Sequence, residues 1–244
     1  MNNQSFNGKT EDYEKGRPEI SHEALEYLYS IIPSDAVFAD IGAGTGKFTS
    51  LIVKKGNFVF AVEPNKEMRT VLENKLQKYQ NIKILETCAE NTGIPSQSVD
   101  VIVAVTALHW FDLNAFKKEC HRILKPGGMV VAIYNSHKTE LRRATEDPTV
   151  KMATKDFFQG KCEIVEFPNP QYFSRDIYIA YRFSHSTAPR PGDQDYALVL
   201  KELNLSFDQN SIDSYYFLDY LTVMYISRDF TINHPLSDDE EEFL

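Results

Sequence analysis

Short hydrophobic runs recur along the first half of the chain, and a polar or mixed segment separates each run from the next. The runs lie at 36–39, 58–62, 82–85, 99–105 and 129–134. Continuous apolar runs of this length are typical of strands that are buried on both faces, as in a parallel sheet. The pattern therefore predicts a parallel sheet with one strand at each run.

The segments between these runs carry hydrophobic residues at helical spacing. The predicted helices run from Ser21 to about Ile32, from about Phe48, from Asn65 to about Leu76, and over 113–124. Ser21 and Asn65 are residue types that cap helix N-termini, and Pro33 and Lys125–Gly128 are typical helix stops. Strands that alternate with helices in this way predict a Rossmann-like, doubly wound α/β fold.

After Tyr134 this alternation ends. We expect a polar, helical stretch at 135–159, a strand at 162–167, helices at 174–183 and 197–207, a loop at 186–195 and a strand at 214–226. The last strand is predicted as an antiparallel edge of the sheet. No internal repeat occurs, so the second half is expected to elaborate the same domain.

Charge and composition exclude several classes of protein. The 244 residues have a formal net charge of −9 and no block of Lys or Arg, which argues against nucleic-acid binding. The longest apolar stretches, 101–108 and 129–134, are far shorter than the about 18–20 residues of a membrane helix, and the N-terminus lacks a signal-peptide core. Three separated cysteines suit reduced thiols. We expect a cytoplasmic protein that does not bind membranes.

A metal centre is not expected. The six histidines are dispersed along the chain, and neither C-x-x-C nor H-E-x-x-H occurs. Cys120 and His121 are adjacent on a predicted helix, where their side chains diverge by about 100° and suit a shared metal ion poorly.

A glycine loop follows the first predicted strand directly. Gly42, Gly44 and Gly46 stand at alternate positions, which lets the backbone turn sharply and approach a ligand. Glu63 ends the second strand, and the ends of neighbouring parallel strands border the crevice where such sheets bind ligands. A carboxylate at that place can accept hydrogen bonds from both hydroxyls of a ribose.

The spacing favours one kind of nucleoside ligand. It is G-x-G-x-G, with Lys47 where the dinucleotide fingerprint G-x-G-x-x-G has its last glycine. Asp40 adds a carboxylate just before the loop, which is unfavourable beside a pyrophosphate and favourable beside an ammonium group. A ligand that combines ribose with ammonium, such as S-adenosylmethionine, therefore fits best.

Four motifs now stand in order, each at the end of its own strand or helix. They are Asp40–Gly46, Ala61–Asn65, Ala89-Glu90 and Leu124–Gly128. Together they resemble class I S-adenosylmethionine-dependent methyltransferases. That resemblance implies a seven-stranded sheet and transfer of a methyl group from S-adenosylmethionine, with release of S-adenosylhomocysteine.

Three further segments are similar to the small-molecule branch of that superfamily, which includes "type 11" and trans-aconitate methyltransferase-like proteins. They lie at 6–18, 107–112 and 183–193. The similarity covers nearly the whole chain and is specific up to about residue 130. We therefore expect a small-molecule methyl acceptor.

The resemblance also implies one domain with five parts. These are an N-terminal arm and helix at 1–35, a cofactor-binding core at 36–135, a lid at 136–210, a C-terminal strand at 211–230 and an acidic tail at 231–244.

Site roles carry over by motif position. The implied cofactor-binding residues are Tyr13, Arg17, Asp40, Gly42, Ala43, Gly44, Gly46, Glu63, Pro64, Asn65, Met68, Ala89, Glu90 and Thr106. The residues expected to line the acceptor pocket are His109, Trp110, Tyr134 and Phe183. His109 is a candidate base for a hydroxyl or amine acceptor, and equally a candidate pocket wall. The acceptor and the methylated atom stay open.

Two alternatives also stay open. A protein that binds the cofactor without turnover, as a regulator or partner subunit, would have the same cofactor motifs. A nicotinamide dehydrogenase is suggested by Tyr134 and Lys138, which fit Y-x-x-x-K. We interpret that match as accidental, because Tyr134 is predicted to end a strand and the two residues then need not share a face. Either a monomer or a homodimer is expected.

Overall fold

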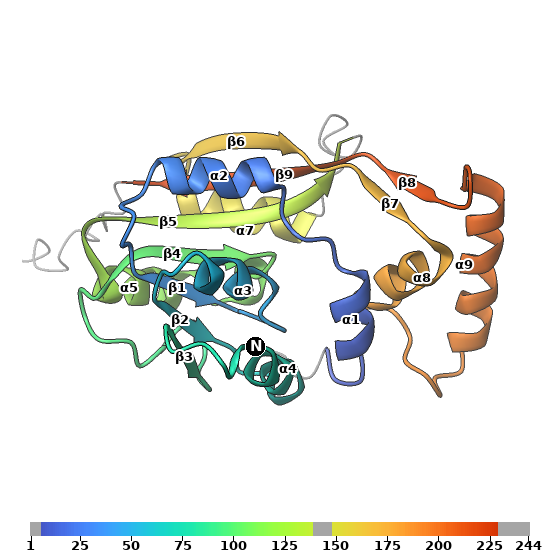
Figure 1. Ribbon diagram of the computed structural model, residues 1–244, viewed down its shortest axis with the longest axis horizontal. Coiled ribbons are helices and arrows are strands. Elements are labelled where there is room, and N and C mark those ends of the chain that lie inside the picture. Colours follow the sequence, from blue (N-terminus) through green and yellow to red (C-terminus); the bar gives the residue numbers. More distant parts are fainter. Residues whose placement is uncertain (1–5, 139–147, 229–244) are drawn as a thin grey trace, which may run out of the picture.

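The computed structural model describes residues 6–138 and 148–228 (Figure 1). Its centre is a seven-stranded sheet in the order β3-β2-β1-β4-β5-β9-β6. The first five of these strands run parallel: β3 (Ile82–Leu85), β2 (Val59–Val62), β1 (Phe38–Ile41), β4 (Val99–Val105) and β5 (Leu124–His137). β9 (Tyr220–Ser227) lies antiparallel between β5 and β6 (Glu163–Pro168). The predicted doubly wound, mainly parallel sheet is confirmed.

Helices cover both faces of this sheet (Figure 1). α2 (His22–Ser30), α3 (Lys47–Lys54) and α4 (Lys66–Leu76) pack on one face, and α5 (Leu113–Ile123) and α7 (Pro148–Phe158) pack on the other. Successive residues of β1 alternate between the two cores, since Phe38 belongs to the first and Ala39 to the second. Burial on both faces is the reason that this strand is continuously apolar.

A smaller unit projects from one end of the sheet. We call residues 171–218 the cap; it contains β7 (Gln171–Phe173), α8 (Arg175–Phe183), α9 (Tyr196–Asn210) and β8 (Tyr216–Leu218). The cap has its own apolar cluster, which includes Phe173, Tyr178 and Phe207. α1 (Thr10–Gly16) from the N-terminal arm lies against α8 (Figure 1). The two helices approach so closely that a Cβ on Gly16 would overlap the backbone of Tyr181.

The structure agrees with the sequence prediction at the arm and differs from it after Tyr134. The predicted helical N-terminal arm is confirmed by α1, which has no side-chain cap and is held by packing on α8. β5 continues through Asn135–His137, where a helix was predicted, because these residues pair with Tyr220–Thr222 of β9. Within the described residues, the predicted helix is represented by α7 (Pro148–Phe158). Residues 139–147 of that predicted helix lie outside the described residues.

Two further differences concern the edge of the sheet. The strand expected as an antiparallel edge is β9, which is antiparallel but internal, because β6 pairs with its outer side. β6 itself falls within the range 136–210 expected for the lid, and it belongs instead to the main sheet. The acidic tail at 231–244 lies outside the described residues.

Candidate functional site

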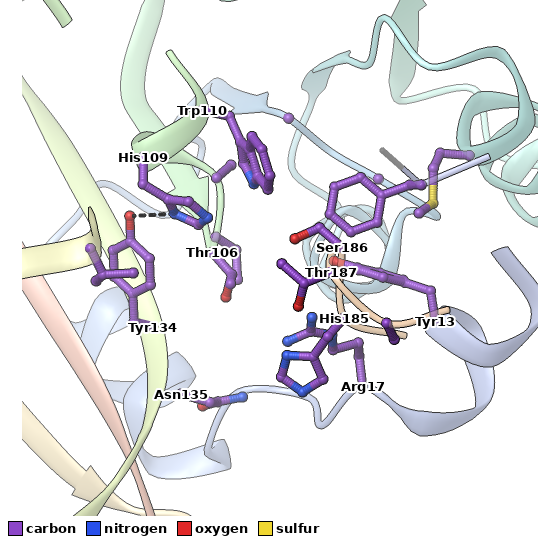
Figure 2. A pocket seen from close by; sticks show the side chains of 18 of the residues that line it. Tyr13, Arg17, Thr106, His109, Trp110, Tyr134, Asn135, His185, Ser186 and Thr187 are labelled. Carbon is purple, nitrogen blue, oxygen red and sulfur yellow. Dashed lines mark hydrogen bonds between the residues drawn. The ribbon is translucent and has the colours of Figure 1, made fainter. Parts of the chain in front are cut away.

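A cavity of about 840 Å³ lies at the carboxyl ends of the parallel strands, where α1 and the cap face the sheet. Figure 2 shows side chains from the arm, the strand ends and the cap that point into it. The predicted site residues that line this cavity are Tyr13, Arg17, Gly42, Gly44, Glu63, Pro64, Asn65, Met68, Ala89, Thr106, His109, Trp110 and Tyr134. The arrangement agrees with the rule that open α/β sheets bind ligands beyond the carboxyl ends of their strands.

The glycine loop is fixed to the end of β2 by backbone hydrogen bonds. The N–H groups of Gly42 and Ala43 donate to the carbonyl oxygen of Val62 at 2.9 and 3.0 Å. The N–H of Gly44 donates to Oε2 of Glu63 at 2.8 Å. The loop and the strand end are therefore one preformed unit.

Glu63 is buried at the floor of the cavity, with 7% of its surface exposed. Its second oxygen, Oε1, accepts the N–H of Asn65 at 2.7 Å. Burial raises the pKa of Glu63, and the hydrogen bonds from Asn65 and Gly44 oppose that rise. Each carboxylate oxygen has about two acceptor positions, so each keeps one beyond the backbone N–H that it accepts.

Asn65 joins the cavity to α4. Its Oδ1 accepts the N–H of Met68 at 3.0 Å, which makes Asn65 the N-cap of that helix. Met68 is 3% exposed and still lines the cavity. Capping and cavity lining are therefore combined at Asn65, as the sequence indicated.

Asp40 lies beneath the loop and does not line the cavity. It is 1% exposed, and its Oδ2 accepts the hydroxyl of Thr49, in α3, at 2.5 Å. Burial raises the pKa of Asp40 to about 7, the Thr49 hydroxyl opposes the rise, and the charge of Glu63 adds to it. Its visible contacts thus connect β1 to α3. The predicted direct contact with a ligand ammonium group is not visible in this geometry.

Gly46 and Ala43 also lie outside the cavity lining. Gly46 has a φ of +77°, and a Cβ there would overlap Cδ1 of Leu72 in α4. Ala43 is 8% exposed and belongs to the apolar core on that face. Both residues are adjacent to the cavity, but the contacts around them are packing contacts.

Glu90 and Phe183 are directed to other partners. The carboxylate of Glu90 accepts the N–H of Asp112 at 2.8 Å, just before α5. Phe183 was expected in the acceptor pocket, yet it is 2% exposed and stacks on Tyr196 inside the cap, with ring centroids 4.7 Å apart. Since α8 turns its apolar face toward α9, Phe183 is a core residue of the cap.

The other predicted acceptor residues meet at the ends of β4 and β5. Nδ1 of His109 lies 3.4 Å from Oη of Tyr134 (Figure 2). Trp110 packs beside His109, with ring centroids 5.1 Å apart. Thr106 has a φ of +52°, unusual for a β-branched residue, and its N–H donates to the carbonyl oxygen of Ile133 at 2.8 Å. His109 and Trp110 lie in the short helix η1 (Leu108–Trp110), which starts two residues after Thr106.

The arm closes one side of the cavity. Tyr13 lies opposite Gly44, since its Oη is the atom nearest to where a Cβ of that glycine would stand, at 3.7 Å. Arg17 directs its guanidinium into the cavity (Figure 2) and lies 5.6 Å from the Tyr13 ring. Among the described residues, the buried Nε of Arg17 has no hydrogen-bond partner. A cation with such a vacant donor is suited to an anionic group of a ligand.

The cap supplies cavity residues that the sequence analysis did not assign. His185, Ser186 and Thr187 line the cavity and follow α8 (Figure 2). Nζ of the buried Lys9 holds this loop by donating to the carbonyl oxygens of His185 and Ser186, at 2.7 and 2.9 Å, and of Ala188, at 2.5 Å. The motif at 183–193 was the signal for these positions, but it did not indicate which of its side chains face the cavity.

Phe6, Asn135 and Tyr220 were also missed. Phe6 packs edge-on against Trp110, with centroids 5.7 Å apart. Asn135 lies at the cavity rim and donates to the carbonyl oxygen of Glu19 at 3.0 Å, which fixes the exit of the arm. Only Phe6 lay in a segment that the sequence analysis had quoted for its resemblance.

A sheet of this order, with a glycine loop after β1 and a buried acid at the end of β2, defines the class I S-adenosylmethionine-dependent methyltransferase fold. Residues 39–132 match the family model described as "Methyltransferase domain". The chain therefore has the class I methyltransferase fold, and its central part is similar to this domain family. Its place in the trans-aconitate methyltransferase-like branch stays a prediction.

Known proteins with a similar sequence or fold extend the comparison. An uncharacterized methyltransferase of Mycobacterium bovis is 37% identical over 138 residues, which are 56% of this chain and 54% of that protein. The chain thus spans about half the length of this relative. A protein of Anaeromyxobacter dehalogenans assigned as a type II methyltransferase has a TM-score of 0.62 at 20% identity, over 87% of this chain and 97% of that one.

A third comparison concerns a structure with a bound ligand. The S-adenosylmethionine-dependent methyltransferase of Thiobacillus denitrificans, solved with S-adenosyl-L-homocysteine, has a TM-score of 0.55 at 14% identity, over 91% of this chain and 97% of that chain. At such identities the likeness to solved structures concerns the fold.

Two searches of the described residues complete the picture of the site. Within residues 6–138 and 148–228, no three His, Cys, Asp or Glu side chains gather as a metal site. No helix in the same ranges is both long and apolar enough to cross a bilayer.

Proposed function

We propose that this chain is an S-adenosylmethionine-dependent methyltransferase that acts on a small-molecule acceptor. The observation that carries the proposal is the buried Glu63 carboxylate, which holds the glycine loop and borders the cavity. A carboxylate in this position binds the two hydroxyls of a ribose with its remaining acceptor positions.

The residues around Glu63 fit S-adenosylmethionine along its length. Glu63 would hold the ribose, while Asn65, Met68 and Ala89 would border the adenine. The space that a Cβ at Gly44 would enter, beside Tyr13, would receive the methionine part, and Arg17 would pair with its carboxylate. When bound, the sulfonium supplies a methyl group that is already activated for displacement.

The contribution of the chain to the reaction is alignment and exclusion of water. A cavity of about 840 Å³ is within the usual size for small ligands, and it is bordered by α1 and by the cap loop that Lys9 holds. Walls of this kind keep an acceptor in line with the methyl group, and such positioning can supply about 7–11 kcal/mol of barrier reduction. A cavity bordered in this way favours a small acceptor over a macromolecule.

The first experiment compares thermal unfolding with S-adenosylhomocysteine, S-adenosylmethionine, NAD and NADP. A ligand at a hundred times its Kd stabilises a protein by about 2.7 kcal/mol, which corresponds to a rise in Tm of roughly 5–10 °C for a chain of this size. We expect a rise with the two adenosyl-sulfur ligands alone. A rise with NAD alone would revive the dehydrogenase, and binding without turnover of any acceptor would favour the regulatory alternative.

A substitution then tests the ribose assignment. Glu63→Ala is expected to weaken binding of S-adenosylhomocysteine more than tenfold, measured by calorimetry, because it removes the ribose acceptor and the anchor of the glycine loop. Glu23→Ala, at an exposed position of α2, is the matched control. An affinity unchanged in Glu63→Ala would remove the ribose assignment.

Further parts of the proposal rest on sequence reasoning. We propose a cytoplasmic protein that acts as a monomer or homodimer and does not bind nucleic acid, with the five-part division of the domain given above. In that division the cap overlaps the lid over 171–210, and we propose that this shared part borders the acceptor.

A further inference from the structure

His109 and Tyr134 form a pair at the acceptor end of the cavity. Their strands are neighbours, since Val105 of β4 lies opposite Ile133 of β5, and each residue follows shortly after that register point. Tyr134 is 2% exposed and packs edge-on against Tyr225, with centroids 6.4 Å apart. Its phenol is therefore held rigidly, with Oη 3.4 Å from Nδ1 of His109.

The imidazole of His109 is oriented by this pair. Its ring lies between Trp110 and Tyr134, with centroids 5.1 and 5.9 Å away. Figure 2 shows Nδ1 directed to Tyr134 and the other ring nitrogen, Nε2, directed to the centre of the cavity. When Nδ1–H donates to the phenolic oxygen, Nε2 is the basic nitrogen.

The other side chains that could take a proton in the cavity are poorer candidates. Burial, followed by the charges of Arg17, Arg182 and Lys9, lowers the pKa of His185 to about 3. His137 lies farther along β5, edge-on to Tyr220 with centroids 5.8 Å apart. Glu63, the carboxylate among the described lining residues, is held by two backbone N–H groups at the cofactor end.

Charge in the cavity narrows the class of acceptor. Among the described lining residues, the permanently charged cations are Arg17 and Arg182. The same residues place no carboxylate at the acceptor end. Since Arg17 is assigned to the methionine carboxylate, an acceptor that carries an ammonium group would face the charge of Arg182 and would find no carboxylate partner at the acceptor end. Aromatic rings, including Trp110, Tyr134 and Tyr181, form much of the wall and suit a planar molecule.

We propose that His109, oriented by Tyr134, accepts the proton of an enol or phenol hydroxyl on a planar acceptor, which becomes an O-methyl ether. The inference rests on the methyltransferase function proposed above. A carboxylate acceptor has no proton to lose, so its methylation needs no base such as His109. An enol or phenol has a pKa near that of tyrosine, about 10, whereas an aliphatic alcohol has a much higher pKa. The smaller difference from the pKa of an imidazole favours proton transfer to histidine.

The step balances in atoms and charge. The acceptor oxygen forms a bond to the methyl carbon, the bond from that carbon to sulfur breaks, and its electron pair goes to sulfur. The hydroxyl proton goes to Nε2 of His109, and the imidazolium is stabilised by its hydrogen bond to Oη of Tyr134. Tyr134 acts through His109 and is a positioning residue.

The first test needs no acceptor. ¹⁵N NMR of the histidine-labelled full chain gives the tautomer of each imidazole, and His109→Gln identifies the His109 signals by their loss. The proposal expects the Nδ1–H tautomer at His109 in the neutral form. It also expects Tyr134→Phe to move the His109 signals while leaving the exposed His22 unchanged. An Nε2–H tautomer, or signals that Tyr134→Phe leaves in place, would overturn the proposal.

The second test identifies the product and the kinetics. The full chain is incubated with methyl-labelled S-adenosylmethionine and the low-molecular-mass fraction of a bacterial extract, and labelled products are identified by mass spectrometry and NMR. We expect an enol or aryl ether. With that acceptor, His109→Gln should lower kcat by about 10²–10⁴-fold, and Tyr134→Phe by about tenfold. His22→Gln, on the surface of α2, should behave as the wild type.

Failure of this inference can be told apart from failure of the proposed function. Binding of S-adenosylhomocysteine by wild type, His109→Gln and Tyr134→Phe is measured alongside, and it should agree within threefold, about 0.7 kcal/mol or less. If the wild type does not bind S-adenosylhomocysteine, the proposed methyltransferase function itself is overturned. A labelled methyl ester or N-methyl product, or a kcat that His109→Gln leaves unchanged, would overturn only the role of His109.

Discussion

Two glycines of the loop, Gly44 and Gly46, are expected to respond very differently to alanine. Both have positive φ, +58° and +77°, so alanine at either position strains the backbone. At Gly44 the new Cβ would meet nothing closer than Oη of Tyr13, at 3.7 Å. At Gly46 it would overlap Cδ1 of Leu72, which is fully buried. One position thus keeps space open in the cavity, while the other permits close packing of the loop on α4.

The magnitudes follow from these surroundings. A non-glycine residue in the left-handed region lowers the free energy of unfolding by about 1–2 kcal/mol. Forcing a methyl group into a packed core lowers it by about 1–3 kcal/mol more. Gly44→Ala should therefore lower the free energy of unfolding by about 1–2 kcal/mol, and Gly46→Ala by about 2–5 kcal/mol. At about 2–4 °C per kcal/mol, the difference is measurable as a shift in Tm.

Denaturant unfolding and ligand calorimetry together test this reasoning. Gly44→Ala should bind S-adenosylhomocysteine more than tenfold more weakly despite its smaller loss of stability, because its Cβ occupies the space beside Tyr13. In the background Leu72→Ala, Gly46→Ala should cost only the backbone strain of about 1–2 kcal/mol. The reasoning fails if Gly44→Ala is the more destabilised variant, or if the effects at Gly46 and Leu72 simply add.

Two further predictions concern buried charges. Lys9→Met should lower the free energy of unfolding by about 1.5–3 kcal/mol or more and speed hydrogen exchange at 185–188, because it removes the donor of three carbonyl groups; unchanged exchange there would contradict the anchoring role. Because the pKa of Asp40 is raised to about 7, the folded state keeps a proton that the unfolded chain loses near pH 4. The stability of wild type relative to Asp40→Asn should therefore fall as pH rises from about 4 to about 7 and level off above, as measured by urea unfolding; a constant difference would refute the raised pKa.

The parallel core could be predicted from sequence because its signals are local. Apolar runs such as 99–105 indicate buried strands on their own, and the position of Glu63 at a strand end follows from the run that precedes it. Neighbouring parallel strands then bring the glycine loop and Glu63 together by topology alone. No distant side chain is needed for this part of the site.

The roles of several site residues could not be predicted from the sequence, because they depend on side chains from other elements. Gly46 looks like a ligand-binding glycine in sequence, and the overlap with Leu72 makes it a packing position. Asp40 looks like a partner for an ammonium group, and the hydroxyl of Thr49 takes its carboxylate. Phe183 looks like a pocket residue until Tyr196 is seen to stack on it. Each of these contacts depends on how two elements pack in three dimensions, which local sequence patterns do not specify.

The cavity is therefore built from two kinds of contact, those between adjacent strand ends and those between distant segments of the chain. The cofactor half is built from adjacent strand ends, whose meeting is fixed by sheet order. The arm and the cap add the remaining walls, with Tyr13 and Arg17 of the arm beside the cofactor half. These walls depend on long-range packing, since Lys9 contacts a loop that lies more than 170 residues further along the chain. The same two elements also pack closely at Gly16, where α1 meets the backbone of α8. A change in the packing of arm on cap would thus move the walls that these elements supply, including Tyr13 and Arg17, while the glycine loop and Glu63, held by their own hydrogen bonds, stay as they are.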